Sequence, residues 1–592
     1  MLPSVNSNLR LVLLNEIPQD AELRAQWDAL ASSVPHPQVF YTYEWALAVQ
    51  RAYGAILHPL VFLAYDESDS LCGIAALAQP EKGRASFLCA TTGDYCDFLS
   101  LPQHRASFVN AVLFGLQKQG IDDAVLTNLP ADSETAAVLR QVSSGYGYHH
   151  FARTAYWCTQ VVLAALPRRP GHTKPDLPRR KMVRHSMNGM SREGTIRIDH
   201  ARSWDKVGPM LPAFAQMHIG RFLLTGRISN QARPERRFFL AELAKLLSEP
   251  GWLVVSRMMS GNHVCAWHYG FRFHDTWFWY QPTFDSELER YSPGFCLLTR
   301  IIEEAAADSG VKVVDMGLGA EEYKDRFANK TQETSYVTLH RSATSHYREI
   351  VRYGASRLVK VTPKTEAAGR WLIETYARVR VRASAGGIAW VFGKLRELVW
   401  LKTEVFFYEF AAPKEANPGT MHLRRLDLNA LADATCQSAD DPATLGYLLR
   451  AAARLRDTRS QGFALVDSEG RFLHFAWATA FDEFFLSELD ATVDAPSADS
   501  VMLFDCWTPA SERGKAYYGR AISMIAELVR ERGQRPWIFS ARSNVASVHG
   551  IEKAGFERRY SLTRQRLFGL QRVTGKTPVS DVPSVEEVSA RA

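Results

Sequence analysis

The feature that most constrains the fold of this chain is a block of secondary-structure elements that recurs three times. Each copy contains alternating apolar segments typical of strands, then a polar loop, a segment with helical spacing and a closing apolar strand. The clearest copy runs from 252 to 326. Recurrence of such a unit in a chain of 592 residues predicts several similar α/β domains, because single domains of that length are uncommon.

The clearest copy predicts a strand pair, a third strand, a helix and a closing strand, at 252–259, 263–273, 276–281, 295–308 and 311–316. A helix start leaves main-chain N–H groups without partners at the positive end of the helix dipole, where an anionic phosphate binds well. Glycine lets the phosphate approach the main chain closely. We therefore expect a phosphate-binding turn at Ser292, Pro293, Gly294 and Phe295. The alternative is plain structure, because a strand, turn and helix with one glycine is common in α/β proteins.

The other two copies lie towards the ends of the chain. The C-terminal copy predicts a helix at 515–530 and strands at 463–467, 471–479, 501–507 and 537–541. The N-terminal copy predicts a helix at 105–117 and strands at 59–65, 71–78, 98–101 and 124–128. Its loop, 102–104, contains no glycine, so we expect this copy to bind no cofactor.

These blocks resemble the GNAT acyltransferase fold, in which coenzyme A lies between splayed strands four and five with its pyrophosphate on the intervening loop and helix start. In the C-terminal copy the glycine-rich motif of that family falls on Arg513, Gly514, Lys515 and Ala516, with Tyr518 where a second small residue is usual. A second family motif begins at Asn544, and Ile551 stands where a tyrosine often serves as general acid. The resemblance implies coenzyme A binding at 513–516 and Asn544, whereas the departure at Ile551 leaves catalysis by this domain open.

The middle block resembles the CelD/BcsL family of acetyltransferases, also called BioF2-like, through ordered motifs at 177–181, 281–285, 291–294, 315–319 and 322–324. That family is related to the FemAB-type transferases and contains two GNAT-like lobes, only one of which normally carries a cofactor. The resemblance covers about 20–345. It implies acetyl-CoA as acyl donor and acceptors from cellulose and exopolysaccharide pathways.

Acyl transfer requires a base for the acceptor, donors for the developing oxyanion and a proton source for the leaving thiolate. Asp285 and Glu322 are the candidate bases, and Tyr323 or Tyr280 could donate a proton. Asp315, at the end of a predicted strand, should also lie near the cleft. The competing interpretations are a loop cap for Asp315 and a solvated charge pair for Glu322. The aromatic run at 277–280 could stack a sugar, but packing in a central strand is more common.

The histidines at 263 and 268 lack partners at metal-ligand spacing, so we expect no metal. The eight cysteines form no CxxC pair and most lie in apolar segments, which is typical of reduced cysteines in a cytoplasmic protein. We find no signal peptide and no apolar run near the roughly 20 residues that span a bilayer.

A basic segment at 341–402 holds 13 Lys/Arg against 4 Asp/Glu. Its mixture of basic and large apolar residues suits a peripheral contact with the inner face of a membrane, or a linker helix that packs on a neighbouring domain. FemAB-type transferases use aminoacyl-tRNA as donor. The modest net charge of +7 argues against that partner, so we expect no nucleic acid.

We therefore predict an α/β protein of tandem GNAT-like folds with mixed central sheets flanked by helices. The parts are lobe one without cofactor, lobe two with an acyl-CoA site, a basic helical connector, a C-terminal GNAT domain and a flexible tail, at 1–165, 166–345, 346–405, 406–570 and 571–592. The predicted activity is acetyl-CoA-dependent transfer to nitrogen or oxygen of a small molecule or saccharide. The alternatives are an aminoacyl-tRNA-dependent transferase and a non-catalytic scaffold of degenerate GNAT folds.

Overall fold

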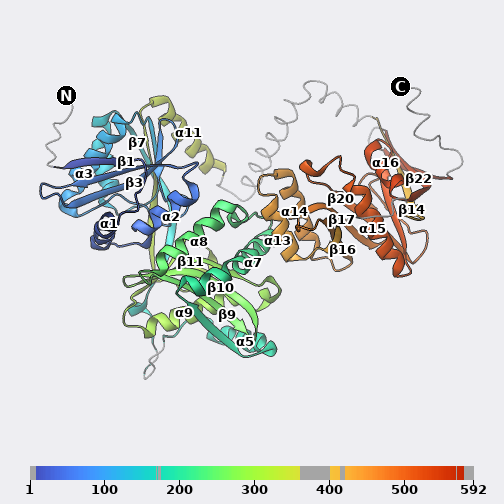
Figure 1. Ribbon diagram of the computed structural model, residues 1–592, viewed down its shortest axis with the longest axis horizontal. Helices are drawn as coiled ribbons and strands as arrows, with labels where there is room; N and C mark the ends of the chain where they lie inside the picture. The colour runs from blue at the N-terminus through green and yellow to red at the C-terminus, as the bar shows by residue number, and fades with distance from the viewer. Residues whose placement is uncertain are drawn as a thin grey trace. The chain divides into compact units, whose positions relative to one another are not determined.

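The computed structural model describes residues 9–168, 170, 175–319, 321–359, 400–413, 420–567 and 570–578. These residues form two compact units (Figure 1). The first unit contains 1–221 and 233–358, and the second contains 222–232 and 359–592. Most of the predicted connector and membrane-contact segment, 360–399, lies outside the described residues, as does 579–592 of the predicted tail.

A single sheet of 13 strands passes through the first unit. The order across it is β1 (Arg10–Leu14), β2 (His58–Tyr65), β3 (Leu71–Glu81), β4 (Arg84–Phe87), β6 (Asp123–Pro130), β13 (Lys330–His340), β7 (His149–Val162), β12 (Val313–Leu318), β11 (Thr276–Phe284), β10 (His263–Phe273), β9 (Leu253–Ser260) and β8 (Ile196–Ala201). The short strand β5 (Leu99–Ser100) pairs with β3 beside this path.

The two predicted lobes are joined in this sheet by exchange of their last strands. Strand β7 is the last strand of lobe one, yet it pairs antiparallel with β12 of lobe two. Strand β13 follows lobe two and pairs antiparallel with β6 of lobe one. These two strands also pair with each other along the whole of β13. Each lobe therefore completes its sheet with a strand from the other.

The strands expected in lobe two form within a few residues of the predicted bounds, because long alternating runs define them. The predicted third strand of lobe one, 98–101, forms only in part. Only Leu99 and Ser100 form a strand there, and the strand that pairs parallel with β6 is β4. Arg84-Ala-Ser-Phe87 is short and half polar, so hydrophobic periodicity gives almost no signal for it.

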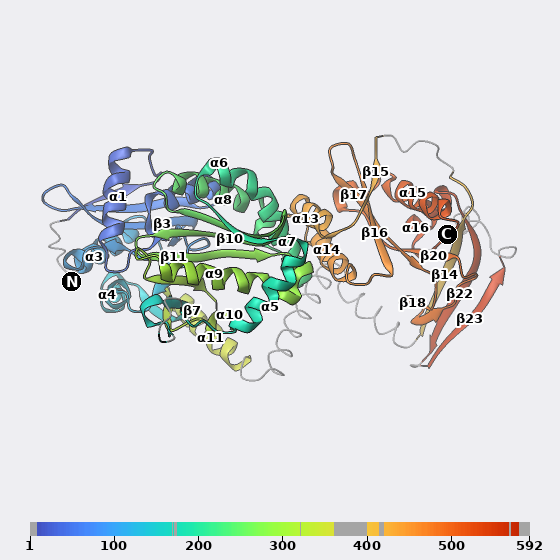
Figure 2. The same ribbon diagram turned by 90° about the horizontal axis from the view of Figure 1, so that it is seen from below.

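Helices cover both faces of this sheet. In lobe two, β10 and β11 lie between α8 (Pro234–Ser248) and α9 (Pro293–Ala307), as Figure 2 shows. Helix α5 (Arg180–Met190) packs on α9, and α2 (Tyr43–Tyr53) packs on α8. The remaining helices of this unit are α1 (Ala21–Ser33), α3 (Pro102–Lys118), α4 (Glu134–Val142), α6 (Trp204–Val207), α7 (Leu211–Leu224), α10 (Glu322–Asp325) and α11 (Ala343–Val359). Prolines in the first turn of α3, α8 and α9 suit positions where an N–H would have no helical partner.

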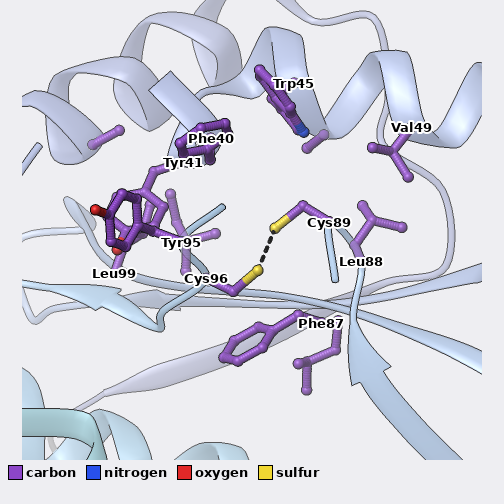
Figure 3. Packing of buried hydrophobic residues seen from close by; sticks show 14 of the residues in the cluster. Phe40, Tyr41, Trp45, Val49, Phe87, Leu88, Cys89, Tyr95, Cys96 and Leu99 are labelled. Carbon is purple, nitrogen blue, oxygen red and sulfur yellow. Dashed lines mark hydrogen bonds between the residues drawn. The ribbon is translucent and has the colours of Figure 1, made fainter. Parts of the chain in front are cut away.

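One hydrophobic core extends through lobe one and under α8. Figure 3 shows part of it, with Phe40 and Trp45 above the sheet and the sulfur atoms of Cys89 and Cys96 3.2 Å apart. The rings of Phe40 and Trp45 meet edge to face at 4.7 Å between centroids. All eight cysteines are free thiols, and most are buried.

The second unit has an eight-stranded sheet. The order is β15 (His422–Arg425), β16 (Ser460–Val466), β17 (Phe472–Ala480), β20 (Ser500–Trp507), β21 (Arg535–Ala541), β14 (Trp400–Phe410), β22 (Phe556–Leu567) and β23 (Leu570–Pro578). A separate hairpin contains β18 (Phe484–Leu486) and β19 (Ala491–Val493). The helices are α13 (Leu428–Gln437), α14 (Pro442–Arg454), α15 (Tyr517–Glu531) and α16 (Val545–Lys553).

Side chains of β17 point alternately to the two faces of this sheet and contact a different helix on each face. Trp477 donates its indole N–H to Tyr447 of α14 at 3.1 Å, whereas the ring of His474 lies 5.5 Å from that of Tyr518 on α15. Residues an odd number apart in a strand point to opposite faces, so α14 and α15 cover opposite sides. Strand β14 fills the place between β21 and β22, as β7 does between β12 and β13 in lobe two.

No helix of the described residues is long and apolar enough to cross a bilayer.

Gly555 allows a close approach of two main-chain segments and supports a stability test. It has φ +99°, and an added Cβ would lie 1.8 Å from the Ala412 carbonyl oxygen. We expect Gly555→Ala to lower the melting temperature of the C-terminal domain strongly, because both backbone strain and a clash are introduced. Gly533 has φ +75° with open space around it, so Gly533→Ala should cost only about 1–2 kcal/mol of strain. Equal losses in calorimetry of the two variants would contradict this interpretation.

Candidate functional site

The C-terminal domain contains a cleft where two parallel strands part. Strands β20 and β21 pair only where Ser500–Leu503 of β20 lies beside Arg535–Ile538 of β21. Further along, their described residues have no pairing with each other. The ladder between β17 and β20 also shifts register near Asp505, whose φ is +44°. Such a bulge bends the strand and frees main-chain groups for a ligand.

A cavity of about 1130 Å³ occupies this cleft. Its lining includes Arg513, Gly514, Ala516 and Asn544, all predicted from the sequence as cofactor-binding residues. Lys515, the fifth of them, does not line the cavity, but it forms an ion pair at 2.9 Å with Glu512, which does. The volume lies slightly above the range of roughly 300–1,000 Å³ that is typical of cofactor and drug-sized ligand sites.

The cavity wall presents a row of unused main-chain donors at the start of α15. Gly514 and Ala516 both have positive φ, and the first N–H of the helix to find a main-chain acceptor is that of Arg520. No side chain caps this end. Within the described chain, no acceptor is found for the N–H groups of Gly514, Lys515, Ala516, Tyr517, Tyr518 and Gly519. A row of free donors at a helix N-terminus is a strong site for a phosphate.

Basic side chains stand around this turn. The Arg513 guanidinium lies 5.5 Å from the centre of the Trp507 ring and donates from Nε to the Thr508 carbonyl oxygen at 3.2 Å. Arg520 and Lys553 also line the cavity. The local positive charge complements an anionic ligand.

His474 lines the same cavity and was not found from the sequence. Its side chain is buried, and its Nδ1 lies 2.7 Å from Thr508 Oγ1. Its Nε2 has no hydrogen-bond partner among the described residues. Burial lowers the pKa of His474 to about 3, so the imidazole is neutral at physiological pH. A single histidine in an apolar strand carries no signal that separates a core position from a site.

A hydroxyl pair spans the cavity floor. Tyr518 of α15 and Ser547 of α16 lie 3.0 Å apart between their hydroxyl oxygens. Burial raises the pKa of Tyr518, which keeps it protonated. Ile551 is fully buried in the core, so α16 brings no hydroxyl at that position. Asn544 caps α16 by accepting from the Ser547 N–H at 3.3 Å.

In lobe two the strands also part, beyond Phe278 on β11 and Asp315 on β12. The predicted phosphate-binding turn forms the start of α9, where Ser292 has φ +48° and Pro293 is the first helical residue. The Cys296 N–H bonds to the Ser292 carbonyl oxygen at 3.1 Å. The N–H groups of Gly294 and Phe295 have no acceptor in the part of the chain that the structure describes.

The three predicted catalytic residues of lobe two lie in different surroundings. Asp285 accepts from the Glu287 N–H at 2.9 Å and lies 2.7 Å from His263 Nε2. Glu322 is 87 % exposed and pairs with Arg326 at 2.5 Å. Tyr323 accepts from the Trp279 indole N–H at 3.3 Å. Their catalytic roles stay predictions.

Tyr280 and the aromatic run have structural contacts. The Tyr280 hydroxyl donates to the Thr92 carbonyl oxygen of lobe one. Trp277 and Trp279 are both buried, which favours core packing over a sugar-binding platform.

Two carboxyl groups meet where lobe one reaches the parted strands of lobe two. Asp315 accepts from Tyr95 at 2.9 Å, Gln160 at 2.7 Å and the Gly317 N–H at 2.8 Å. Asp94 of lobe one lies against Gly317, where an added Cβ would be 2.3 Å from its Oδ2. Burial and the charge of Asp315 raise the pKa of Asp94 to about 7. Sequence reasoning missed Asp94 because the contact joins segments more than 200 residues apart.

No group of three or more His, Cys, Asp or Glu that could hold a metal is present in the described ranges.

Residues 178–325 match the family model described as Acetyltransferase (GNAT) domain. A search of curated proteins finds no match. Among solved structures, the C-terminal domain of a putative lysylphosphatidylglycerol synthetase from Agrobacterium fabrum is 12% identical, with 56% of this chain and 95% of that chain covered and a TM-score of 0.36.

Two further structures are similar at the same level. FemX is 9% identical, with 53% of this chain and 95% of that chain covered and a TM-score of 0.38. A tandem GNAT protein from the clavulanic acid biosynthesis pathway is 11% identical, with 56% and 99% covered and a TM-score of 0.33. The match places a GNAT acetyltransferase domain within lobe two, and the strand orders show mixed sheets in both units.

The raised pKa of Asp94 gives a pH test of its surroundings, which include Asp315, Lys324 and Arg236. An unfolded aspartate has a pKa of about 3.9, so the fold favours protonated Asp94. This stabilisation is present below about pH 4 and is lost as the pH rises towards 7. The free energy of unfolding of the first unit should therefore fall more steeply between pH 4 and 7 in the wild type than in Asp94→Asn. Urea titrations measure it, with Glu322→Gln as control. Parallel curves for wild type and Asp94→Asn would contradict the prediction.

Proposed function

We propose that the protein is an acyl-CoA-dependent transferase that acylates a nitrogen or oxygen atom, with acetyl-CoA as donor. Coenzyme A would bind at two turns, Arg513–Ala516 in the C-terminal domain and Ser292–Phe295 in lobe two. The observation that carries the proposal is the C-terminal cavity, whose wall presents free N–H groups from Gly514 to Gly519. Those groups suit the diphosphate of coenzyme A.

The side chains of the C-terminal cleft can serve the remaining steps. Arg513 and Lys553 add positive charge beside the diphosphate. Tyr518, with Ser547 beside it, is positioned to protonate the leaving thiolate from α15 in place of a tyrosine at Ile551. The thioester is already activated, so positioning supplies much of the rate enhancement.

Lobe two supports the same chemistry. The matched segment, 178–325, contains the parted strands and the free N–H groups of Gly294 and Phe295. The resemblance to the CelD/BcsL family favours a saccharide or an exopolysaccharide precursor as acceptor.

Calorimetric titration of the full chain with acetyl-CoA tests the two binding turns. We expect two sites in the wild type. Arg513→Glu should weaken one of them roughly tenfold to a hundredfold, because a charge-assisted phosphate contact is replaced by repulsion. Gly294→Trp should remove the other by covering the start of α9.

Two matched controls accompany these variants. Arg532→Glu makes the same charge change on an exposed residue outside the cavity, and Gly354→Trp replaces a helical glycine that has open space around it. Both should bind acetyl-CoA as the wild type does. Absence of binding by the wild type would refute the proposed function.

A further inference from the structure

We propose that lobes one and two together form an acceptor site, in which Arg236 binds an anionic group of the acceptor and Asp94 takes the proton that the acceptor loses. This inference rests on the proposed acyl-transfer activity. It assigns the class of acceptor, which is an amine or alcohol that also carries a phosphate or carboxylate.

Arg236 is a buried cation with unused donors. Its side chain on α8 leaves only 5% of the residue exposed. Nη2 donates to the Tyr280 hydroxyl at 2.8 Å, and the Tyr53 hydroxyl also interacts with the guanidinium. Nε and Nη1 have no hydrogen-bond partner in the part of the chain that the structure describes. Among the described residues no carboxylate forms an ion pair with it.

The energetics of this arrangement favour an anionic ligand. Arginine stays charged in proteins, so burial cannot be relieved by loss of a proton. The ring of Phe239 lies 5.0 Å from the guanidinium and offers some compensation. Unpaired buried charge nevertheless costs several kcal/mol, and a phosphate or carboxylate matches the fork of two free N–H groups.

Asp94 is linked to Arg236 by a short chain of contacts. Arg236 bonds to Tyr280, and Tyr280 donates to the carbonyl oxygen of Thr92, two residues before Asp94. The positive charges of Lys324 and Arg236 both lower the pKa of Asp94, so Arg236 interacts electrostatically with Asp94. Lys324 is itself buried and donates to the Leu318 carbonyl oxygen at 2.8 Å.

The position of Asp94 suits proton transfer at lobe two. Its carboxyl group lies against Gly317 of β12, beyond the last pairing of β12 with β11 at Asp315. The Leu318 main chain and the Lys324 charge both lower the pKa of Asp94 and partly offset the effect of its burial. Asp315 differs, because three donors already satisfy its carboxylate. Asp94 is therefore the carboxylate of this pair that can receive a proton from a ligand.

The transfer step follows from these positions. The acceptor N–H or O–H gives its proton to an Asp94 carboxylate oxygen as the acceptor atom bonds to the acyl carbon of the thioester. The carbon–sulfur bond then breaks, and the sulfur leaves as a thiolate. The carboxylic acid of Asp94 returns the proton to that thiolate, so the site is restored and the products are the acylated acceptor and a free thiol.

Glucosamine 6-phosphate is a suitable probe because it carries both an amine and a phosphate. Its effect on the melting temperature is compared with those of glucose 6-phosphate and glucosamine, which each lack one of these groups. Both phosphorylated sugars should stabilise the wild type, and glucosamine should not. Arg236→Gln should remove the shift, and Arg236→Lys should retain part of it. If both phosphorylated sugars leave the wild type unshifted, or shift Arg236→Gln equally, the proposal is overturned.

The role of Asp94 is measured by release of free thiol from acetyl-CoA in the presence of glucosamine 6-phosphate. Asp94→Asn should retain the melting shift but lose transfer by roughly a hundredfold or more. The exposed Asp69→Asn, in a turn of lobe one, is the control and should transfer normally. Unchanged transfer by Asp94→Asn would overturn its assignment as base.

Failure of this inference is distinguishable from failure of the proposed function. Calorimetry with acetyl-CoA reports donor binding alone, whereas the sugar phosphate shift reports the acceptor site alone. Donor binding without any shift from the sugar phosphates leaves the proposed function standing and rejects the anionic acceptor.

Discussion

The antiparallel pairing of β7 with β13 is the interaction on which the first unit depends. It runs the whole length of β13 and places the last strand of each lobe beside the sheet of the other. Separation of the two lobes would break three ladders, those of β6 with β13, β13 with β7 and β7 with β12. The contacts between Tyr95 and Asp315, and between Asp94 and Gly317, are therefore held at fixed distance even though they join distant segments.

The same arrangement recurs in the C-terminal domain with a different source for the strand. Strand β14 precedes the domain in sequence and fills the place between β21 and β22. In lobe two the corresponding place is filled by β7, which precedes lobe two in the sequence. A GNAT-like block of this chain thus needs a strand that enters from outside the repeated unit. The last residues before this block, from Trp400 to Phe410, belong to its sheet rather than to a linker.

Local patterns in the sequence were enough to predict most strands and helices of the three blocks and the turn at Ser292–Phe295, whereas the turn at Arg513–Ala516 was expected from the family resemblance. Those features are set within some 20 residues, where alternation, glycine and proline carry the signal. The exchange of β7 and β13 could not be predicted, because pairing between distant strands leaves no local pattern. For the same reason Asp94 and Arg236 were missed. His474 was missed because its neighbours, Thr508 and Tyr518, come from two other elements.

Arg236 and Asp94, which were missed, are also groups whose burial is unfavourable to the folded state. A buried arginine with free N–H groups and a carboxyl with a raised pKa both lower the stability of the folded state. A continuous sheet with strand exchange offsets such losses, because its ladders and the core beneath α8 are independent of the site. Charged groups that are unfavourable to bury, brought together at one place, are typical of a functional site. That contrast is why the contact between the lobes, rather than the exposed Glu322, is the place to seek the acceptor chemistry.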